Sequence, residues 1–215
     1  MGKNIYREAL IAAAVLLILG WLLGVAVSSC RGEWEQHPTP NHVSLISELE
    51  SRLPRNHPYR EPDIVMTGHE CTHGVNSYFR NARGGRWNAF YTFGGMVCYL
   101  QEPPVRLADV AVAVPYDRRG RHYHLYLIQG QGDWQNQPLY ILDELTAYMN
   151  GAAVGFEQGL QDRAQDSLQS AREFIVYAKC LCRLLRERQI TRPDIEDFVG
   201  ACEAYLDQLA REFVQ

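Results

Sequence analysis

The sequence predicts a mixed α+β fold, and three observations support this prediction. Residues 158–188 and 191–213 each repeat apolar side chains at the 3.6-residue period of an amphipathic helix. Residues 63–80 also look helical. Between these regions, residues 89–93 and 96–100 are short β-like runs separated by a pair of glycines. The expected architecture is therefore a small β-sheet combined with several helices, the last two of which form a hairpin.

The composition excludes several classes of protein. Hydrophobic residues make up 47% of the 215 residues and charged residues 21%, which excludes general disorder and collagen-like or coiled-coil chains. A formal net charge of −4 argues against nucleic acid as a partner, because phosphate binding needs a concentrated basic surface. No repeat of about 20 to 50 residues is present, which excludes solenoids and propellers.

Residues 1–30 predict a targeting or anchoring segment. Lys3 and Arg7 precede an uncharged run, Ala9–Val27, that is long enough to cross a membrane as a helix. The run ends at Val27-Ser28-Ser29-Cys30, which resembles the lipobox of bacterial lipoproteins. A lipoprotein signal peptide acylated at Cys30 and an uncleaved signal anchor both stay open. The basic residues favour a cytoplasmic N-terminus, so either segment tethers the protein to a membrane, facing the periplasm or extracellular side.

Residues 31–62 differ in composition from the rest of the chain. They contain five prolines, a pattern typical of a stalk or of an arm extended over the domain, with one short helical stretch near 43–52. The chain is therefore expected to consist of the membrane segment 1–30, the Pro-rich arm 31–62 and one domain over 63–215.

Two further β-like runs are expected after the glycine pair, at residues 110–114 and 122–129. In the second run, Tyr123, Leu125 and Leu127 alternate with residues that suit a wetter face. This alternation predicts a strand with one face toward solvent.

The C-terminal region predicts an antiparallel helical hairpin. Thr191 caps the second helix and Pro193 lies in its first turn. Two states stay open for the cysteines of this hairpin: a disulfide from Cys180 or Cys182 to Cys202, or buried thiols.

The strongest chemical signal is His69-Glu70-Cys71-Thr72-His73, which is the HExxH pattern. Residues four apart project from one face of a helix, so the two imidazoles converge on one metal ion. Glu70 directly follows the first histidine and reaches the position where a general base belongs. The alternative is a pair of surface histidines with an unrelated glutamate.

A catalytic zinc ion needs a third protein ligand and an open position for water. No histidine follows His73 closely, so the third ligand comes from elsewhere. Residues 138–151 are the best source, because they are apolar except for Asp143 and Glu144. Acidic groups on a nearly buried helix are costly unless they are paired or bind a metal. From Glu144, the small residues Ala147 and Gly151 share one helix face and allow close packing.

A carboxylate-bearing helix downstream of HExxH resembles the gluzincin branch of the zincin metallopeptidases. This resemblance implies a zincin-like catalytic domain with His69, His73 and Glu144 as ligands of one Zn²⁺ ion per chain. It also implies that Glu70 is the catalytic base that activates a zinc-bound water. The chain looks like uncharacterised bacterial membrane-tethered proteins with an HExTHGxNS-type motif as well.

Several other residues compete with Glu144 for the position of third ligand. They are His122 or His124, Glu102, Asp109 and Glu157. For Asp143, two roles stay open: it fixes a ligand histidine through the free ring nitrogen, or it compensates charge at a helix N-terminus.

Three further features receive two interpretations each. Tyr148 either donates a hydrogen bond to the oxyanion of the reaction or packs in an aromatic core. Asn76 either hydrogen-bonds near the site or caps the end of its helix. Arg80, Arg83 and Arg86 are either a solvated loop or a group that binds an anion or a C-terminal carboxylate.

The sequence therefore predicts a zinc metallopeptidase, a hydrolase that cleaves a peptide or protein substrate outside the cytosol. Two alternatives remain: a membrane-tethered binding or scaffold protein with structural or vestigial zinc, and a cell-wall amide hydrolase.

Overall fold

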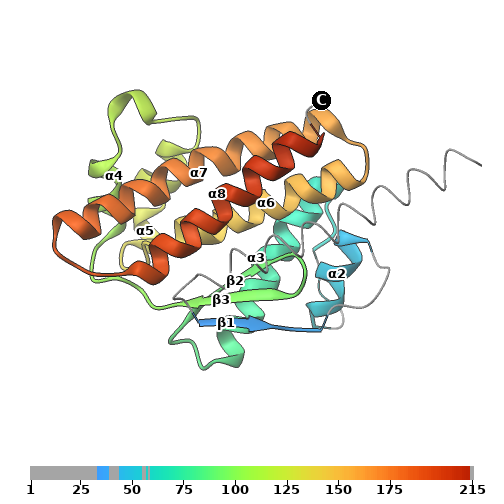
Figure 1. Ribbon diagram of the computed structural model, residues 1–215, viewed down its shortest axis with the longest axis horizontal. Coiled ribbons are helices and arrows are strands. Elements are labelled where there is room, and N and C mark those ends of the chain that lie inside the picture. Colours follow the sequence, from blue (N-terminus) through green and yellow to red (C-terminus); the bar gives the residue numbers. More distant parts are fainter. Residues whose placement is uncertain (1–32, 39–43, 55–56, 58, 214–215) are drawn as a thin grey trace, which may run out of the picture.

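The structure, a computed structural model, describes residues 33–38, 44–54, 57 and 59–213 (Figure 1). It is an α+β fold, as the sequence predicts. The predictions for residues 1–30 lie outside the described residues. Within the described part, no helix combines the length and the apolar character needed to span a membrane.

A three-stranded antiparallel sheet forms one side of the molecule, with the order β1-β3-β2. Its strands are β1 (Glu33–Gln36), β2 (Asn88–Thr92) and β3 (Met96–Leu100). The last two are the predicted β-like runs. Gly94 and Gly95 turn the chain between them with φ angles of 83° and 77°, which favour glycine.

The Pro-rich arm contributes to the same fold. Its strand β1 pairs with β3 in a register that sets Trp34 opposite Cys98. The helix α2 (Leu45–Arg52) follows, and its buried Leu45 and Leu49 join the core. Residues 33–36 are thus part of the sheet, and residues 45–52 contribute to the core of the protein.

The predicted helices at both ends of the domain are present. They are α3 (Ile64–Ala82), α6 (Tyr140–Glu157), α7 (Gln161–Glu187) and α8 (Pro193–Phe213). In Figure 1, α6, α7 and α8 lie side by side over the sheet, and α7 and α8 form the expected hairpin. No disulfide joins the hairpin in the described structure, where Cys180, Cys182 and Cys202 are buried thiols.

The predicted strand at residues 110–114 is wrong, because these residues belong to the helix α4 (Leu107–Ala113). The side chain of Asp109 accepts a hydrogen bond from the backbone N–H of Arg106, which closes the helix start. Val110 is fully buried, whereas Val112 is 82% exposed. The helical spacing becomes visible only when the window is extended to residue 107.

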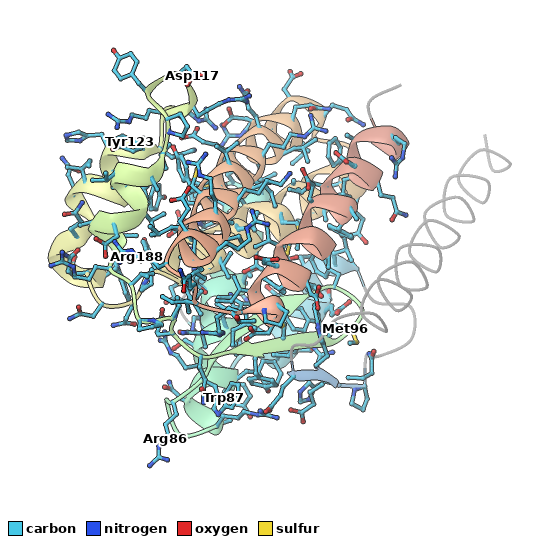
Figure 2. All side chains as sticks on the ribbon, turned by 60° about the vertical axis from the view of Figure 1, so that its left-hand side comes forward. Arg86, Trp87, Met96, Asp117, Tyr123 and Arg188 are labelled. Carbon is cyan, nitrogen blue, oxygen red and sulfur yellow. The ribbon has the colours of Figure 1, made fainter. Side chains whose placement is uncertain are left out.

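The predicted strand at residues 122–129 is also wrong. Residues Tyr123–Gln129 form a π-helix, η2, which follows the short 3₁₀ helix η1 (Tyr116–Arg118) and precedes α5 (Gln131–Trp134). Leu127 is buried while Leu125 is 53% exposed, so the two do not share a face. Figure 2 shows that Tyr123 lies far from Met96, which is the first residue of β3. Without a neighbouring strand, the segment satisfies its backbone groups internally.

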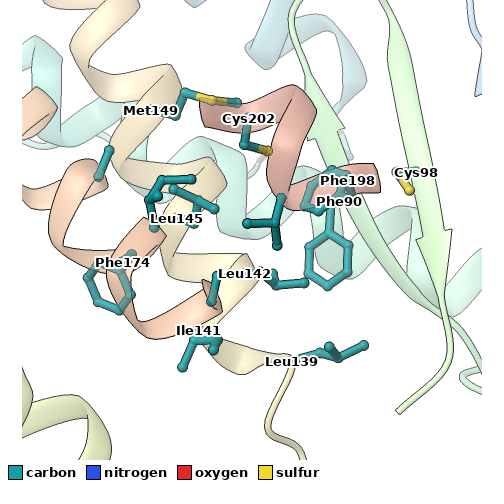
Figure 3. Close-up of a cluster of buried hydrophobic side chains, with 14 of the residues drawn as sticks. Phe90, Cys98, Leu139, Ile141, Leu142, Leu145, Met149, Phe174, Phe198 and Cys202 are labelled. Carbon is teal, nitrogen blue, oxygen red and sulfur yellow. The ribbon is translucent and has the colours of Figure 1, made fainter. Parts of the chain in front are cut away.

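The core lies between the sheet and the C-terminal helices (Figure 3). Phe90 of β2 meets Phe198 of α8 with ring centroids 5.3 Å apart. Leu142 and Leu145 of α6 and Phe174 of α7 are fully buried in the same cluster. This packing fixes α6 against the sheet.

The contact between α3 and α6 depends on glycines. A Cβ atom at Gly151 would lie 2.9 Å from the Val65 carbonyl oxygen, and one at Gly68 would lie 3.0 Å from Val154 Cγ2. Both distances are too short for a well-packed helix pair. The two helices therefore approach closely because neither residue has a side chain.

We expect Gly151→Ala to lower the free energy of unfolding by about 1–3 kcal/mol, because the new methyl group meets backbone that cannot rotate away. Chemical denaturation measures the change. The matched control is Gly200→Ala on the exposed side of α8, where a Cβ meets no atom within 4 Å. It should stabilise by up to about 1 kcal/mol through helix propensity. Equal effects of the two substitutions would contradict this view of the contact.

Candidate metal centre

His69 and His73 lie one helical turn apart on α3, and their Nε2 atoms are 3.1 Å from each other. The carboxylate of Glu144 on α6 faces both rings. Its Oε2 lies 3.7 Å from Nε2 of His69, and its Oε1 lies 3.6 Å from Nε2 of His73. The three side chains each offer a ligand atom within 4.8 Å of the others, and they are the one such His/Cys/Asp/Glu group among the described residues.

The position of Glu144 follows from the packing of α6 on α3. The glycine contacts bring the two helix axes close, and a Cβ at Gly151 would lie only 3.5 Å from Cβ of His69. Glu144 lies about two turns earlier on α6, so it meets the same face of α3. The sequence prediction that small residues accompany this carboxylate is borne out by the packing.

Two buried atoms of this group have no hydrogen-bond partner in the described structure. They are Oε2 of Glu144 and Nδ1 of His69. The Glu144 side chain is only 5% exposed, so its unpartnered oxygen carries a desolvation cost. A cation between the three side chains would give this oxygen a partner. The group therefore fits a bound divalent metal ion.

The protonation of the group reflects burial. Burial and, to a smaller extent, the charge of the neighbouring His73 lower the pKa of His69 to about 3, so this ring is neutral as a metal ligand must be. Burial raises the pKa of Glu144 to about 7. Burial also acts to lower the pKa of His73, but the ion pair with Asp143 outweighs it and raises the value to about 9.

Asp143 holds the second histidine in place. Its Oδ2 accepts a hydrogen bond of 2.6 Å from Nδ1 of His73, which leaves Nε2 of that ring turned toward Glu144. This contact is the orienting role that the sequence analysis left open for Asp143. Such partners fix the tautomer and the ring orientation of metal-binding histidines.

Asn76 connects this pair to the rest of the protein. Its amide nitrogen donates to Oδ1 of Asp143 at 2.7 Å and to Oγ1 of Thr146 at 3.1 Å. Its amide oxygen accepts from the backbone N–H of Tyr91 in β2 at 2.7 Å. Asn76 lies within α3 and does not cap it, so the helix-cap interpretation is wrong. The residue links α3, α6 and β2 beside the candidate metal-binding group.

A cavity of about 620 Å³ opens beside the group. Glu70 lines it together with His69, His73 and Glu144. The negative charge of Glu70 acts to raise the pKa values of both His73 and Glu144, so the three groups interact electrostatically. A carboxylate in this position meets the requirement for a general base next to a metal ion.

Aromatic residues form part of the cavity wall. Trp134 and Tyr140 stack with ring centroids 4.5 Å apart, and the Tyr140 hydroxyl donates to Oε1 of Glu144 at 2.7 Å. Sequence reasoning missed Tyr140. Its spacing of four residues before Glu144 on one helix was a signal that could have found it.

Tyr148 lies next to the candidate ligands but behind the cavity wall. Its ring packs against that of His69 with centroids 4.4 Å apart, and its hydroxyl is 3.2 Å from the hydroxyl of Tyr126. Tyr126, from the π-helix, lines the cavity, whereas Tyr148 is not among the lining residues. Tyr126 was also missed, because its segment was predicted to be a strand.

The competing third ligands lie elsewhere and have other partners. His122 contacts Ser170, Asp109 pairs with Arg188, and Glu157 accepts from the backbone N–H of Leu45. His124 is exposed on η2. Glu102 is on the cavity wall, where its two oxygens accept from Asn88 and from the backbone N–H of Leu139. None of them joins the metal-binding group within the described residues.

No protein-family model, curated protein or solved structure matches this chain. The functional conclusions below therefore depend on the geometry of the site and on the sequence pattern.

Glu102 makes stability depend on pH. Burial raises the pKa of its carboxyl from 4.5 to about 7. Because the folded state then binds this proton more tightly than the unfolded state, the stabilisation is complete below pH 4.5 and is lost as the pH rises through 7. As the pH rises between these values, we expect the free energy of unfolding to fall less in Glu102→Gln than in the wild type. The two falls should differ by at most about 3 kcal/mol.

Denaturant unfolding of the metal-free protein at a series of pH values measures this difference. Glu50→Gln, at an exposed position of α2, is the matched control and should follow the wild type. Parallel pH profiles for the wild type and Glu102→Gln would contradict the role assigned to Glu102.

Proposed function

We propose that the protein is a zinc-dependent metallopeptidase with a zincin-like, gluzincin-type catalytic domain. The observation that carries this proposal is the meeting of His69, His73 and Glu144 in a largely buried group beside Glu70, where Oε2 of Glu144 has no hydrogen-bond partner in the described structure. The HExxH sequence and the downstream glutamate support the same assignment.

Zinc suits the donor set, because two imidazoles and one carboxylate are the three protein ligands of many catalytic zinc sites. His73, whose pKa is raised to about 9 in the metal-free protein, would release its proton when it binds the ion. His69, His73 and Glu144 would hold one ion per chain. When bound there, zinc would act as a Lewis acid that acidifies water and polarises a substrate carbonyl.

The protein's own residues carry the proton transfers. Glu70 takes a proton from the attacking water, whose oxygen forms a bond to the carbonyl carbon of the substrate. Glu70 then passes the proton to the amide nitrogen as the C–N bond breaks, so an acid and an amine leave. Asp143 keeps the His73 ring oriented throughout, and Asn76 holds Asp143.

The edge of the sheet supports an extended peptide as the substrate. Strand β2 is at the edge of the described sheet, and Ala89 and Phe90 line the cavity. The backbone groups of Tyr91 point away from β3: its N–H donates to Asn76 and its C=O accepts from Asn150. Alternation along the strand turns the same groups of Ala89 outward as well, where an extended chain can pair with them.

We propose that two phenol groups help to stabilise negative charge on the reacting carbonyl oxygen. Burial raises the pKa values of Tyr126 and Tyr148, so both hydroxyls keep their protons at neutral pH. Because Tyr126 lines the cavity, its hydroxyl is the one that meets substrate, and Tyr148 positions it through the contact between the two oxygens.

We expect Tyr126→Phe to lower kcat by about 10²-fold, the effect typical of losing one oxyanion donor. Tyr148→Phe should lower kcat less, because it removes only the hydroxyl that positions Tyr126. Steady-state kinetics with a peptide substrate measure both. A larger loss in Tyr148→Phe would instead assign the donor to Tyr148, one of the two roles that the sequence analysis left open for it.

The decisive experiment combines elemental analysis with proteolysis. We expect one zinc ion per chain in the wild type and loss of the zinc in Glu144→Ala. Glu70→Gln should keep its zinc but lose about 10²–10⁴-fold in peptide hydrolysis, the range for a general acid–base group. Glu50→Gln on the exposed face of α2 should behave as the wild type.

Equal cleavage by the wild type and Glu70→Gln would refute the assigned base. Full zinc occupancy with no product from a peptide library would favour the scaffold protein with structural zinc. Cleavage of isolated peptidoglycan without cleavage of casein would favour the cell-wall amide hydrolase.

The location of this activity is also a proposal. If residues 1–30 are a membrane anchor or a lipoprotein signal, they hold the peptidase at the outer side of the cytoplasmic membrane. Fractionation of cells before and after protease treatment of the exposed surface tests this placement.

A further inference from the structure

One arginine side chain lines the cavity next to the candidate metal centre. Arg80 lies on α3, seven residues after His73 and four after Asn76, so it shares their face of the helix. Among the described lining residues it is the single arginine or lysine. The residue is half-buried.

The other two arginines of this stretch have different surroundings. Arg83 pairs with Glu33 and Glu35 of β1 and stacks over the ring of Tyr99. Arg86 projects away from the body of the protein at the turn before β2 (Figure 2). Arg80 is therefore the one of the three that belongs to the cavity.

Arg80 has no carboxylate partner within the described part of the chain. Its hydrogen bond there is a long one, 3.5 Å, to the hydroxyl of Ser77. Two acidic residues are near enough for Arg80 to lower their pKa values, namely Glu102 and Asp143. Both use their oxygens elsewhere: Glu102 bonds Asn88 and Leu139 N–H, and Asp143 bonds His73 and Asn76, as described above.

A half-buried arginine without an ion-pair partner among the described residues is an incomplete site. Arginine has five N–H donors and no acceptor, and its planar fork matches a carboxylate in two parallel hydrogen bonds. The contact to Ser77 uses only one donor, and no carboxylate oxygen of the described residues pairs directly with the guanidinium. The cavity that Arg80 lines also contains the metal-binding group, so a molecule bound there reaches both.

The spacing along α3 limits where the carboxylate sits on a substrate. Seven residues of helix separate His73 and Arg80 by about 10 Å along the axis. An extended peptide advances about 3.4 Å per residue. The carboxylate therefore belongs within about three residues of the bond that is cleaved.

On the basis of the proposed function, we infer that Arg80 binds a substrate carboxylate and so selects peptides with an acidic group close to the scissile bond. A C-terminal carboxylate and an aspartate or glutamate side chain supply the same chemistry. The enzyme would then act near chain ends in the first case and at acidic sequences in the second.

A binding experiment tests this inference without depending on turnover. The protein is the full chain carrying Glu70→Gln, before and after zinc addition, so bound peptides are not cleaved. The probes are three pools of N-acetylated tripeptides. The first has free C-termini, the second has amidated C-termini, and the third has amidated C-termini and contains one glutamate residue. Acidic side chains are absent from the first two. Isothermal titration calorimetry measures the affinities.

We expect one of the two carboxylate-bearing pools to bind at least tenfold more tightly than the neutral amidated pool. Which one does so identifies the source of the carboxylate. Adding Arg80→Gln should remove the preference, Arg80→Lys should keep part of it, and Arg83→Gln should leave it intact. Circular dichroism shows whether each variant is folded.

Equal binding of all three pools, no binding of any, or a preference that survives Arg80→Gln would overturn the inference. These outcomes are separable from failure of the proposed function. Zinc-dependent cleavage of casein without a carboxylate preference would leave the peptidase standing and reject the role of Arg80. A preference that depends on Arg80 in a protein that binds no zinc would support the role of Arg80 and reject the zinc peptidase.

Discussion

The close contact between α3 and α6 determines the rest of the site. Gly68 and Gly151 let the two helices approach until a carboxylate of one faces two imidazoles of the other. A wider spacing would let water reach Glu144 and would separate the three ligand atoms. The buried carboxylate is costly in this position, and the packing of α6 against the sheet and α7 compensates for it. Burial of the Glu144 carboxylate therefore lowers the stability of the fold but positions this group next to the two imidazoles.

The hydrogen bonds around this contact make the arrangement rigid. Asn76 is bound at once to Asp143, to Thr146 and to the edge strand β2. Asn150 adds a second link, from α6 to Thr72 of α3 and to the Tyr91 carbonyl of β2. Because buried amides without partners are unfavourable, a shift of any one of the three elements would break several bonds together. The sheet and the group formed by His69, His73 and Glu144 are therefore coupled.

Local patterns allowed much of this to be predicted from the sequence. The HExxH spacing is a property of one helix, so its geometry follows from the helical repeat alone. Glu144 lies 71 residues after His73, yet it was predictable because a carboxylate in an apolar helix needs a partner. The long helices were predictable for the same reason as most amphipathic helices, namely their repeated apolar positions.

The errors have a physical cause in common. Residues 110–114 and 122–129 are short apolar runs, and short runs fit a strand or one turn of helix equally well. Their conformation depends on neighbours distant in sequence, such as the α6 and α7 residues around Phe174. The π-helix brings Tyr126 to the cavity, so an error in secondary structure hid a candidate for the chemistry. The sequence shows Arg80 as one of three neighbouring arginines. That Arg80 has no carboxylate partner among the described residues could be seen only in the structure.

The strand β1 has a mechanical consequence. It starts at Glu33 and is hydrogen-bonded to β3, so it is fixed to the body of the protein. For a lipid or helix anchor that ends at Cys30, only two residues would separate the anchor from the sheet, a reach of about 11 Å at full extension. Such a protein would stay within a short distance of the bilayer surface. It could therefore contact only molecules that lie close to the membrane.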